Sequence, residues 1–303
     1  MITLDDFLNL PKREIAKLVR ESGNQVCIFP INGTRRWFAL EHGHESFDNP
    51  IEAYMDISGQ AHIDLYRLMF DYGVDTLLTP IFGGELFRRG DEYMQKIGAD
   101  GLARIATHPD FLNFYNEYDV RVRFYGDYRK ELKNTSYAHL CELFDQITEQ
   151  TLSHTSHRLF FGVFATDATE TVAELGVRYH SENGRVPDRR TIVSMYYGEH
   201  INPASIYISS DKFWVFDYPL LSSGEEDLYF MVAPCLYLSD VQLRHILYDH
   251  LFARSIDHPD YADMSKEGFL AMKKFYTHNR EKTLGVGKML DNVWYPLHVD
   301  EAI

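Results

Sequence analysis

The stretch QVCIFPINGTRRWF, residues 25–38, decides the fold. An apolar run ends at Pro30, a short Asn-Gly-Thr turn follows, and two adjacent arginines come next. A buried strand followed at once by a tight turn and the start of a helix is the unit that builds the ligand-binding edge of an open α/β sheet. Because the whole chain carries a formal charge of −15, two adjacent cations at this edge predict a local site for an anion.

Further short runs share the character of this first strand. They are rich in β-branched and aromatic residues, are bounded by Gly, Pro or Asp, and cover residues 74–82, 120–127, 157–166 and 204–209. Helical patterns alternate with them at about 50–72, 90–118, 167–180, 188–197, 239–254 and 265–277. Several runs are apolar on both faces, as in a parallel sheet covered on each side. We therefore predict a single α/β domain over residues 1–303, with a mostly parallel sheet and helices on both faces.

The charge balance and the cysteines narrow the class of protein. The chain has 45 acidic and 30 basic side chains, whereas general nucleic-acid binding needs a basic face. The same balance argues against docking on an anionic membrane, and no apolar run approaches the roughly 18 residues of a membrane helix. The three cysteines lie far apart without a CxxC pair, and the N-terminal segment carries charges throughout. We expect a reduced, cytoplasmic protein without a membrane span or a nucleic-acid partner.

The Asn-Gly-Thr turn and the two arginines form a candidate phosphate cradle. Gly33 would let the backbone approach a ligand, and free N–H groups at the start of the next helix favour an anion. Arg35 and Arg36 add planar, permanently charged donors that suit phosphate oxygens. The spacing is neither that of a nucleotide P-loop nor that of a dinucleotide GxGxxG loop. From these residues alone, a surface turn with two solvated arginines is an equally open interpretation.

Ordered sequence blocks identify a family that the turn belongs to. They read FPINGTRRWF, TPIF, RRGDEY, FYGDYRK, HRLFFGVF, YYGEH, VFDYPLLSSG, DLYFMVAP and RHILYDH. With these blocks the chain resembles the cis-prenyltransferases, which share the undecaprenyl diphosphate synthase fold. The resemblance is closer to one offshoot, the diterpene synthases of the tuberculosinyl transferase and kolavelool synthase type. It covers nearly the whole chain, to about residue 294.

The resemblance implies a diterpene synthase of the lyase or transferase class. Such an enzyme ionises a bicyclic allylic diphosphate, of the kolavenyl or tuberculosinyl type, that a separate class II cyclase supplies. Water would capture the cation as a tertiary allylic alcohol, or a nucleoside such as adenosine would take the prenyl group. Chain elongation fits less well, because residues 204–223 hold Lys212 but none of the arginines that bind a second diphosphate in elongating enzymes. The family is also usually homodimeric.

Site residues follow from the same resemblance. The diphosphate would be bound by Gly33, Thr34, Arg35, Arg36 and Trp37, and both arginines would stabilise the leaving group. Tyr54 would lie near the allylic carbon, where its hydroxyl could orient a nucleophile or its ring could stabilise the cation. A helix tyrosine that packs in the core is the alternative for Tyr54.

Three acids are further candidates. Asp227 matches the position of a Mg²⁺-binding glutamate in elongating cis-prenyltransferases, although the tuberculosinyl branch has no acid there. Asp91 and Asp127 lie beside or after predicted strand ends, where each could shape the site or cap a helix. Metal binding and structural roles are both open for these positions.

Asn32 is the departure from the family pattern. The resemblance places an aspartate here, which holds Mg²⁺ on the diphosphate in elongating enzymes. An amide is a poor Mg²⁺ ligand and cannot act as a base. Asn32 is therefore a catalytic candidate with three explanations: an enzyme that needs no metal at this position, an artificially inactivated variant, or a non-catalytic diphosphate-binding homologue. A requirement for Mg²⁺ is left open with them.

Overall fold

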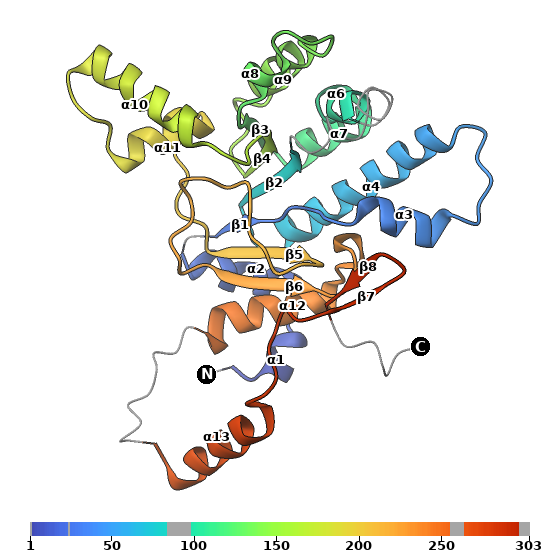
Figure 1. Cartoon of the computed structure of the whole chain (residues 1–303), viewed down its shortest axis with the longest axis vertical. Helices are drawn as coiled ribbons and strands as arrows, with labels where there is room; N and C mark the ends of the chain where they lie inside the picture. Colours follow the sequence, from blue (N-terminus) through green and yellow to red (C-terminus); the bar gives the residue numbers. More distant parts are fainter. Residues whose placement is uncertain (1, 24, 84–97, 255–263, 297–303) are drawn as a thin grey trace.

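The computed structural model describes residues 2–23, 25–83, 98–254 and 264–296. Its centre is a six-stranded, all-parallel sheet in the order β3-β4-β2-β1-β5-β6 (Figure 1). The strands are β1 (Val26–Ile28), β2 (Thr76–Phe82), β3 (Val120–Tyr125), β4 (His157–Val163), β5 (Ile206–Ser210) and β6 (Asp227–Met231). The predicted parallel α/β fold is confirmed, and the five predicted strands correspond to β1–β5.

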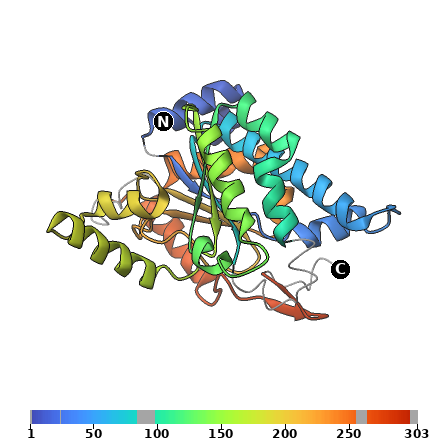
Figure 2. The same ribbon diagram turned by 90° about the horizontal axis from the view of Figure 1, so that it is seen from above.

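Helices cover both faces of the sheet, as the two-sided apolar strands predict. One face packs against α1 (Leu4–Leu8), α2 (Lys12–Glu21), α4 (Pro50–Asp71), α6 (Asp100–Thr107), α7 (Pro109–Glu117), α8 (Tyr128–Leu132), α9 (His139–Gln150) and α12 (Asp240–Tyr248). The other face packs against α10 (Thr169–Asn183) and α11 (Arg189–Tyr197), which lie on the opposite side of the sheet from α4 and α7 (Figure 2).

Alternation along the strands divides the core in two. Cys27 points into the larger cluster, whereas Val26 and Ile28 point into the smaller one. In β4, Phe161 and Phe160 divide in the same way, and both are fully buried. Each large apolar side chain removed from water contributes about 1.5–3 kcal/mol to folding. This two-sided burial fixes the register of the sheet and thus the level at which each strand ends.

The helix α4 forms one wall of the site, and its sequence defines both of its ends. The side chain of Asn49 accepts a hydrogen bond from the backbone of Glu52, and Pro50 occupies the first turn, where its missing N–H is no loss. The helix ends at Asp71, and Gly73 follows with a φ of 88°. That left-handed conformation suits glycine and terminates the helix.

Several expected elements differ in extent. The expected helix at 90–118 has its first residues outside the described ranges, and the rest divides at His108, whose backbone is extended because Pro109 follows. The first strand is shorter than expected, and the helix expected over 239–254 changes after Tyr248 into a π-helical turn, η4 (Asp249–Ala253).

The sequence reading missed some elements altogether. They include the strand β6, the helices α8 and α9, and an antiparallel pair, β7 (Lys288–Leu290) and β8 (Val293–Tyr295). The helices α3 (Thr34–His42), α13 (Lys266–Asn279) and the short η3 (Cys235–Tyr237) complete the described elements. Within the described ranges, no helix combines the length and the apolar character that a membrane span requires.

Candidate active site

A cleft of about 1370 Å³ opens at the carboxyl edge of the sheet. Residues within four positions of the ends of four strands line it: Asn32 after β1, Asp127 after β3, Thr166 after β4 and Asp211 after β5. The strand β1 lies between β2 and β5, and the chain extends the sheet first on one side of β1 and then on the other. This is the topological switch point, where open α/β sheets bind their ligands.

The turn after β1 has the form of an anion cradle. Gly33 has a φ of 82°, and a Cβ atom there would lie 2.8 Å from Cβ of Pro234. Glycine is therefore required twice, by backbone conformation and by space. The helix α3 starts at the next residue, so the first N–H groups after Gly33 have no acceptor within the helix. These donors face the edge where the predicted diphosphate would lie.

Asn32 is held between β1, β5 and η3. Its Nδ2 atom donates a hydrogen bond to Oγ of Ser209 at 2.9 Å, and its backbone carbonyl accepts one from Cys235 at 3.0 Å. The amide of Asn32 thus donates to a defined partner. A carboxylate at this position has no proton to donate, so it could pair with Ser209 only by accepting a hydrogen bond from the Ser209 hydroxyl. The site therefore provides a hydrogen-bond acceptor for the side-chain nitrogen of Asn32.

The two predicted arginines line the cleft in different surroundings. Arg36 forms a two-pronged ion pair with Asp211, with Nη1–Oδ1 and Nη2–Oδ2 distances of 2.7 and 3.1 Å. Arg35 is exposed and also lines the cleft. An arriving diphosphate would therefore share Arg36 with Asp211 or displace that carboxylate.

The wall formed by α4 holds one predicted residue and two that the sequence reading missed. The predicted Tyr54 lines the cleft together with Ser58 and His62, and the three are spaced four residues apart on one helix face. The Phe38 ring packs edge-on against Tyr54 at 5.2 Å. His62 Nε2 lies 3.1 Å from Oγ1 of Thr34, and burial lowers its pKa to about 4. The position of His62, two steps of four residues after Tyr54, is the signal that could have found it.

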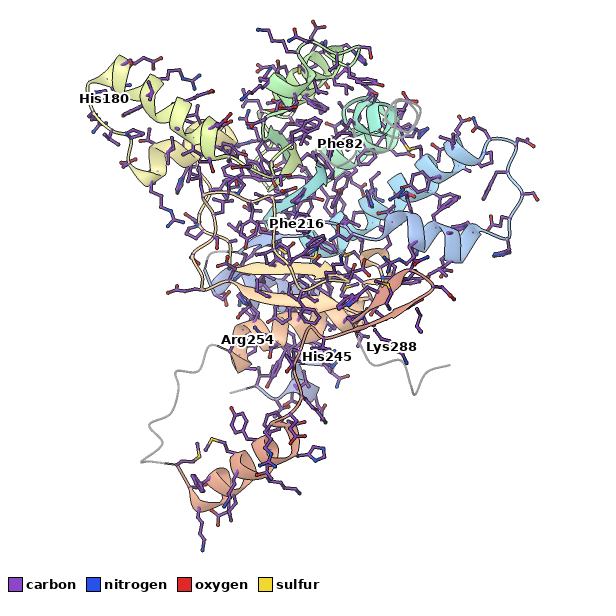
Figure 3. The ribbon with its side chains drawn as sticks, viewed as in Figure 1. Phe82, His180, Phe216, His245, Arg254 and Lys288 are labelled. Carbon is purple, nitrogen blue, oxygen red and sulfur yellow. The ribbon has the colours of Figure 1, made fainter. Side chains whose placement is uncertain are left out.

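An apolar wall continues from the cradle. Ile63, Phe82, Leu102 and Phe111 line one part of the cleft, and aromatic residues of the loop after β5 and of the β7–β8 pair line another. Figure 3 labels Phe216, in the loop after β5, near the centre of the view, and Phe82, the last residue of β2, above it. The cleft therefore joins a cationic, donor-rich end to a hydrocarbon-binding wall.

Of three other residues that the sequence predicts for the site, one lines the cleft. Asp127 lines the cleft, and its Oδ1 atom accepts a hydrogen bond from Thr171 at 2.5 Å. Trp37 does not line the cleft and packs against His42, at 5.5 Å between ring centroids. Asp91 lies outside the described residues.

The structure does not bring Asp227 together with Asn32. Asp227 starts β6, three residues before Phe230, which pairs with Ser209, so it lies about 10 Å back along the strand from the level of Asn32. There its carboxylate is bound by His250 at 2.7 Å and by Arg254 at 3.4 Å.

The donors near Asn32 do not fit a Mg²⁺ ion held by side chains alone. Asn32 offers an amide, and Asp211 is already engaged by Arg36. The described part of the chain contains no group of three or more His, Cys, Asp or Glu residues arranged to hold a metal ion.

Comparison with known proteins identifies the family of this chain. The chain is 39% identical to tuberculosinyl adenosine transferase of Mycobacterium tuberculosis over 297 residues, which cover 97% of this chain and 98% of that protein. The chain belongs to the tuberculosinyl adenosine transferase family. It is also 25% identical to (+)-kolavelool synthase of Herpetosiphon aurantiacus, over 97% of this chain and 95% of the synthase. No profile of a known protein family matches the sequence.

Solved structures confirm the fold of this family member. A probable undecaprenyl diphosphate synthase from Campylobacter jejuni superimposes with a TM-score of 0.55 at 12% identity, covering 78% of this chain and 97% of that one. Lavandulyl diphosphate synthase from Lavandula x intermedia, in complex with dimethylallyl diphosphate, gives 0.54 at 11% identity, with 80% and 100% coverage. The chain is thus an enzyme of prenyl-diphosphate chemistry with a cis-prenyltransferase fold.

Proposed function

We propose that the protein is a diterpene synthase that ionises a bicyclic diterpenyl diphosphate of the kolavenyl or tuberculosinyl type. Water then captures the allylic cation, giving a tertiary alcohol and diphosphate. The observation that carries this proposal is the single cleft that joins the Gly33 cradle to an apolar wall. A diphosphate head and a bicyclic hydrocarbon tail need these two surfaces side by side.

The cradle supplies the driving force for ionisation in this proposal. Negative charge builds on the diphosphate as its ester C–O bond breaks. Arg36, which Asp211 holds, and the N–H groups at the start of α3 are donors oriented before the reaction, and Arg35 adds a second positive charge. Preorganised donors of this kind stabilise developing charge most strongly in a site that excludes water. Asp211 holds the guanidinium of Arg36 in a defined orientation until the substrate arrives.

The cations of the cleft argue for one diphosphate rather than two. Apart from Arg35 and Arg36, the described lining holds Arg104 and Lys212. Arg104 is paired with Asp56, which leaves Lys212 as the cation in the loop after β5. An elongating enzyme would bind a second diphosphate, so this charge count supports ionisation and capture.

Transfer of the prenyl group to a nucleoside such as adenosine is the second candidate function. The 39% identity with the transferase favours it. Water needs no binding surface of its own, whereas adenosine needs one beside the apolar wall. We further propose that a class II cyclase supplies the substrate and that two copies of the chain associate.

The test is incubation of the purified protein with kolavenyl, tuberculosinyl and geranylgeranyl diphosphates, each with and without adenosine. Extracted tertiary alcohol is the expected product, and its formation should not need adenosine. Prenylated adenosine in place of the alcohol would establish the second candidate. Diphosphate binding without turnover of any substrate would contradict both. Repeating the assay with a chelator measures any requirement for Mg²⁺.

A further inference from the structure

His62 and Thr34 form a hydrogen-bonded pair behind the cradle. Thr34 is the first residue of α3, and its Oγ1 atom lies 3.1 Å from Nε2 of His62 and 3.2 Å from the carbonyl oxygen of Ile31. A threonine hydroxyl has one proton, so it can donate to either acceptor while its lone pairs face a third group. Both side chains belong to the lining of the cleft.

The pair lies where the cradle meets the hydrocarbon wall. Thr34 directly follows Gly33, and the neighbour of His62 on α4 is Ile63, which lines the apolar part of the cleft. A substrate with its diphosphate at Gly33 and its rings against Ile63 would place its breaking C–O bond between the two surfaces. Burial lowers the pKa of His62 to about 4, so at neutral pH the imidazole is uncharged and one nitrogen keeps a free lone pair.

We infer that His62, acting through the hydroxyl of Thr34, accepts the proton released when water captures the allylic cation. This inference rests on the proposed hydration. The ester C–O bond breaks and both its electrons leave with the diphosphate. The water oxygen then forms a bond to the allylic carbon, and the resulting oxonium gives a proton to Oγ1 of Thr34 as Thr34 passes its own proton to Nε2 of His62. The products are the alcohol, diphosphate and an imidazolium that returns its proton to solvent.

Other described groups near the cradle are poorer acceptors. The side-chain amide of Asn32 is not basic enough to accept a proton from the water. In the structure Asp211 is paired with both Nη atoms of Arg36, and Asp127 already accepts a hydrogen bond from the hydroxyl of Thr171. A neutral imidazole also avoids placing a second negative charge beside the diphosphate, which a carboxylate at position 32 would do.

Loss of the proton acceptor should change which product forms and should not abolish product formation. Without a base positioned for water, the departed diphosphate is the nearest acceptor, and it would remove a proton from a carbon next to the cation to give a diene. A positioned general base contributes about 10²–10⁴-fold to the step that it serves. His62→Gln and Thr34→Val should therefore lower the ratio of alcohol to diene by about tenfold or more, even where diphosphate release slows.

The experiment measures both quantities with kolavenyl and tuberculosinyl diphosphates. Thr34→Ser keeps the hydroxyl and should therefore keep the parent ratio of alcohol to diene. A purely structural role of Thr34 would not require this result. His245→Gln is the matched control, because His245 is exposed on the outer side of α12, where its Nδ1 contacts only its own helix at Val241 among the described residues (Figure 3). It should leave the ratio and the rate unchanged.

The outcomes separate the two proposals. An unchanged ratio in folded His62→Gln and Thr34→Val enzymes, with alcohol still formed by the parent, overturns the proton acceptor and leaves the hydration standing. Thr34→Ser behaving like Thr34→Val also overturns the relay. Absence of alcohol from the parent enzyme with every substrate overturns the hydration and the inference together.

Discussion

Arginines gather at both edges of the same parallel sheet, and the two gatherings differ in what surrounds them. At the carboxyl edge, Arg36 pairs with Asp211 beside the open cleft. At the amino edge, Arg121 and Arg158 both reach Glu199, with N–O distances of 2.9 and 3.6 Å, and the Glu199 side chain is 17% exposed. Cations alone do not define a binding site. Both edges supply a carboxylate, but among the described residues only the carboxyl edge adds the start of a helix and a volume for the ligand.

The largest contrast should come from removing arginines at each edge. We expect the double substitution Arg35→Ala and Arg36→Ala to weaken binding of inorganic diphosphate by about 10²–10⁴-fold, because each charged hydrogen-bond donor contributes about 1.5–3 kcal/mol. Arg121→Ala, at the amino edge, should leave that affinity unchanged. Isothermal titration calorimetry measures both. If the double variant binds diphosphate as well as the parent, the cradle is assigned to the wrong loop.

Neutralising the acid at each edge sharpens the same contrast. Glu199→Gln leaves the neighbouring arginines without a buried counter-charge and should lower the free energy of unfolding by about 3 kcal/mol. Asp211→Asn, in a partly exposed pair, should change stability by less than about 1 kcal/mol and raise diphosphate affinity, since Arg36 is released. Urea unfolding and calorimetry test the two effects. Equal losses of stability would show that the edges do not differ.

The glycine of the cradle can be compared with a glycine far from it. Gly33→Ala should destabilise the fold by about 1–3 kcal/mol, from a left-handed backbone and the contact with Pro234, and should weaken diphosphate binding. Gly184→Ala meets the same backbone preference, at a φ of 69°, but has open space around it. We expect a loss of about 1 kcal/mol there and no change in diphosphate affinity. Thermal unfolding with and without diphosphate separates the two contributions.

Lowering the pH should lower the free energy of unfolding through protonation of His62. Its pKa is about 4 in the folded protein, below the ordinary value of 6.5, so the unfolded chain binds more protons between these values. The contribution of the neutral imidazole is fully present above pH 6.5 and is lost as the pH falls toward 4. Between pH 7 and pH 5 it should amount to about 2 kcal/mol. Unfolding measured across this range should show a shallower pH dependence for His62→Gln, and an identical slope would contradict the buried, neutral state.

The smallest effect is expected at Asn32. Asn32→Asp provides a Mg²⁺ ligand that the amide does not, so turnover should become more dependent on Mg²⁺ while its maximum rate changes by less than about tenfold. Turnover measured against Mg²⁺ concentration and with a chelator checks this. A gain of more than about 100-fold would instead mean that asparagine silences an enzyme built for aspartate.

Local patterns explain how much could be predicted from the sequence. The strands β1–β5 lie in runs rich in β-branched and aromatic residues, and the carboxyl-edge residues Asn32 and Asp127 were correctly placed after strand ends. The edge strand β6 was missed although residues 228–233 are an apolar run, because a short apolar run does not by itself distinguish a strand from other buried structure. His62 was missed because a lone histidine on a helix is ordinary until the neighbouring chain is known. Asp211 directly follows β5, and the strand-end rule would have found it.

The sequence by itself determined the cradle, because the strand, the Asn-Gly-Thr turn and the first residues of α3 are consecutive and need only local geometry. Tertiary structure decided what surrounds it. His62 reaches Thr34 across 28 residues, and Asp211 reaches Arg36 across 175. Such contacts depend on the register of parallel strands and on the packing of α4 against α3, which are set by burial of the two cores as a whole. The anion-binding loop therefore follows from the local sequence. The partners of that loop, the carboxylate of Asp211 and the imidazole of His62, are brought to it by the fold.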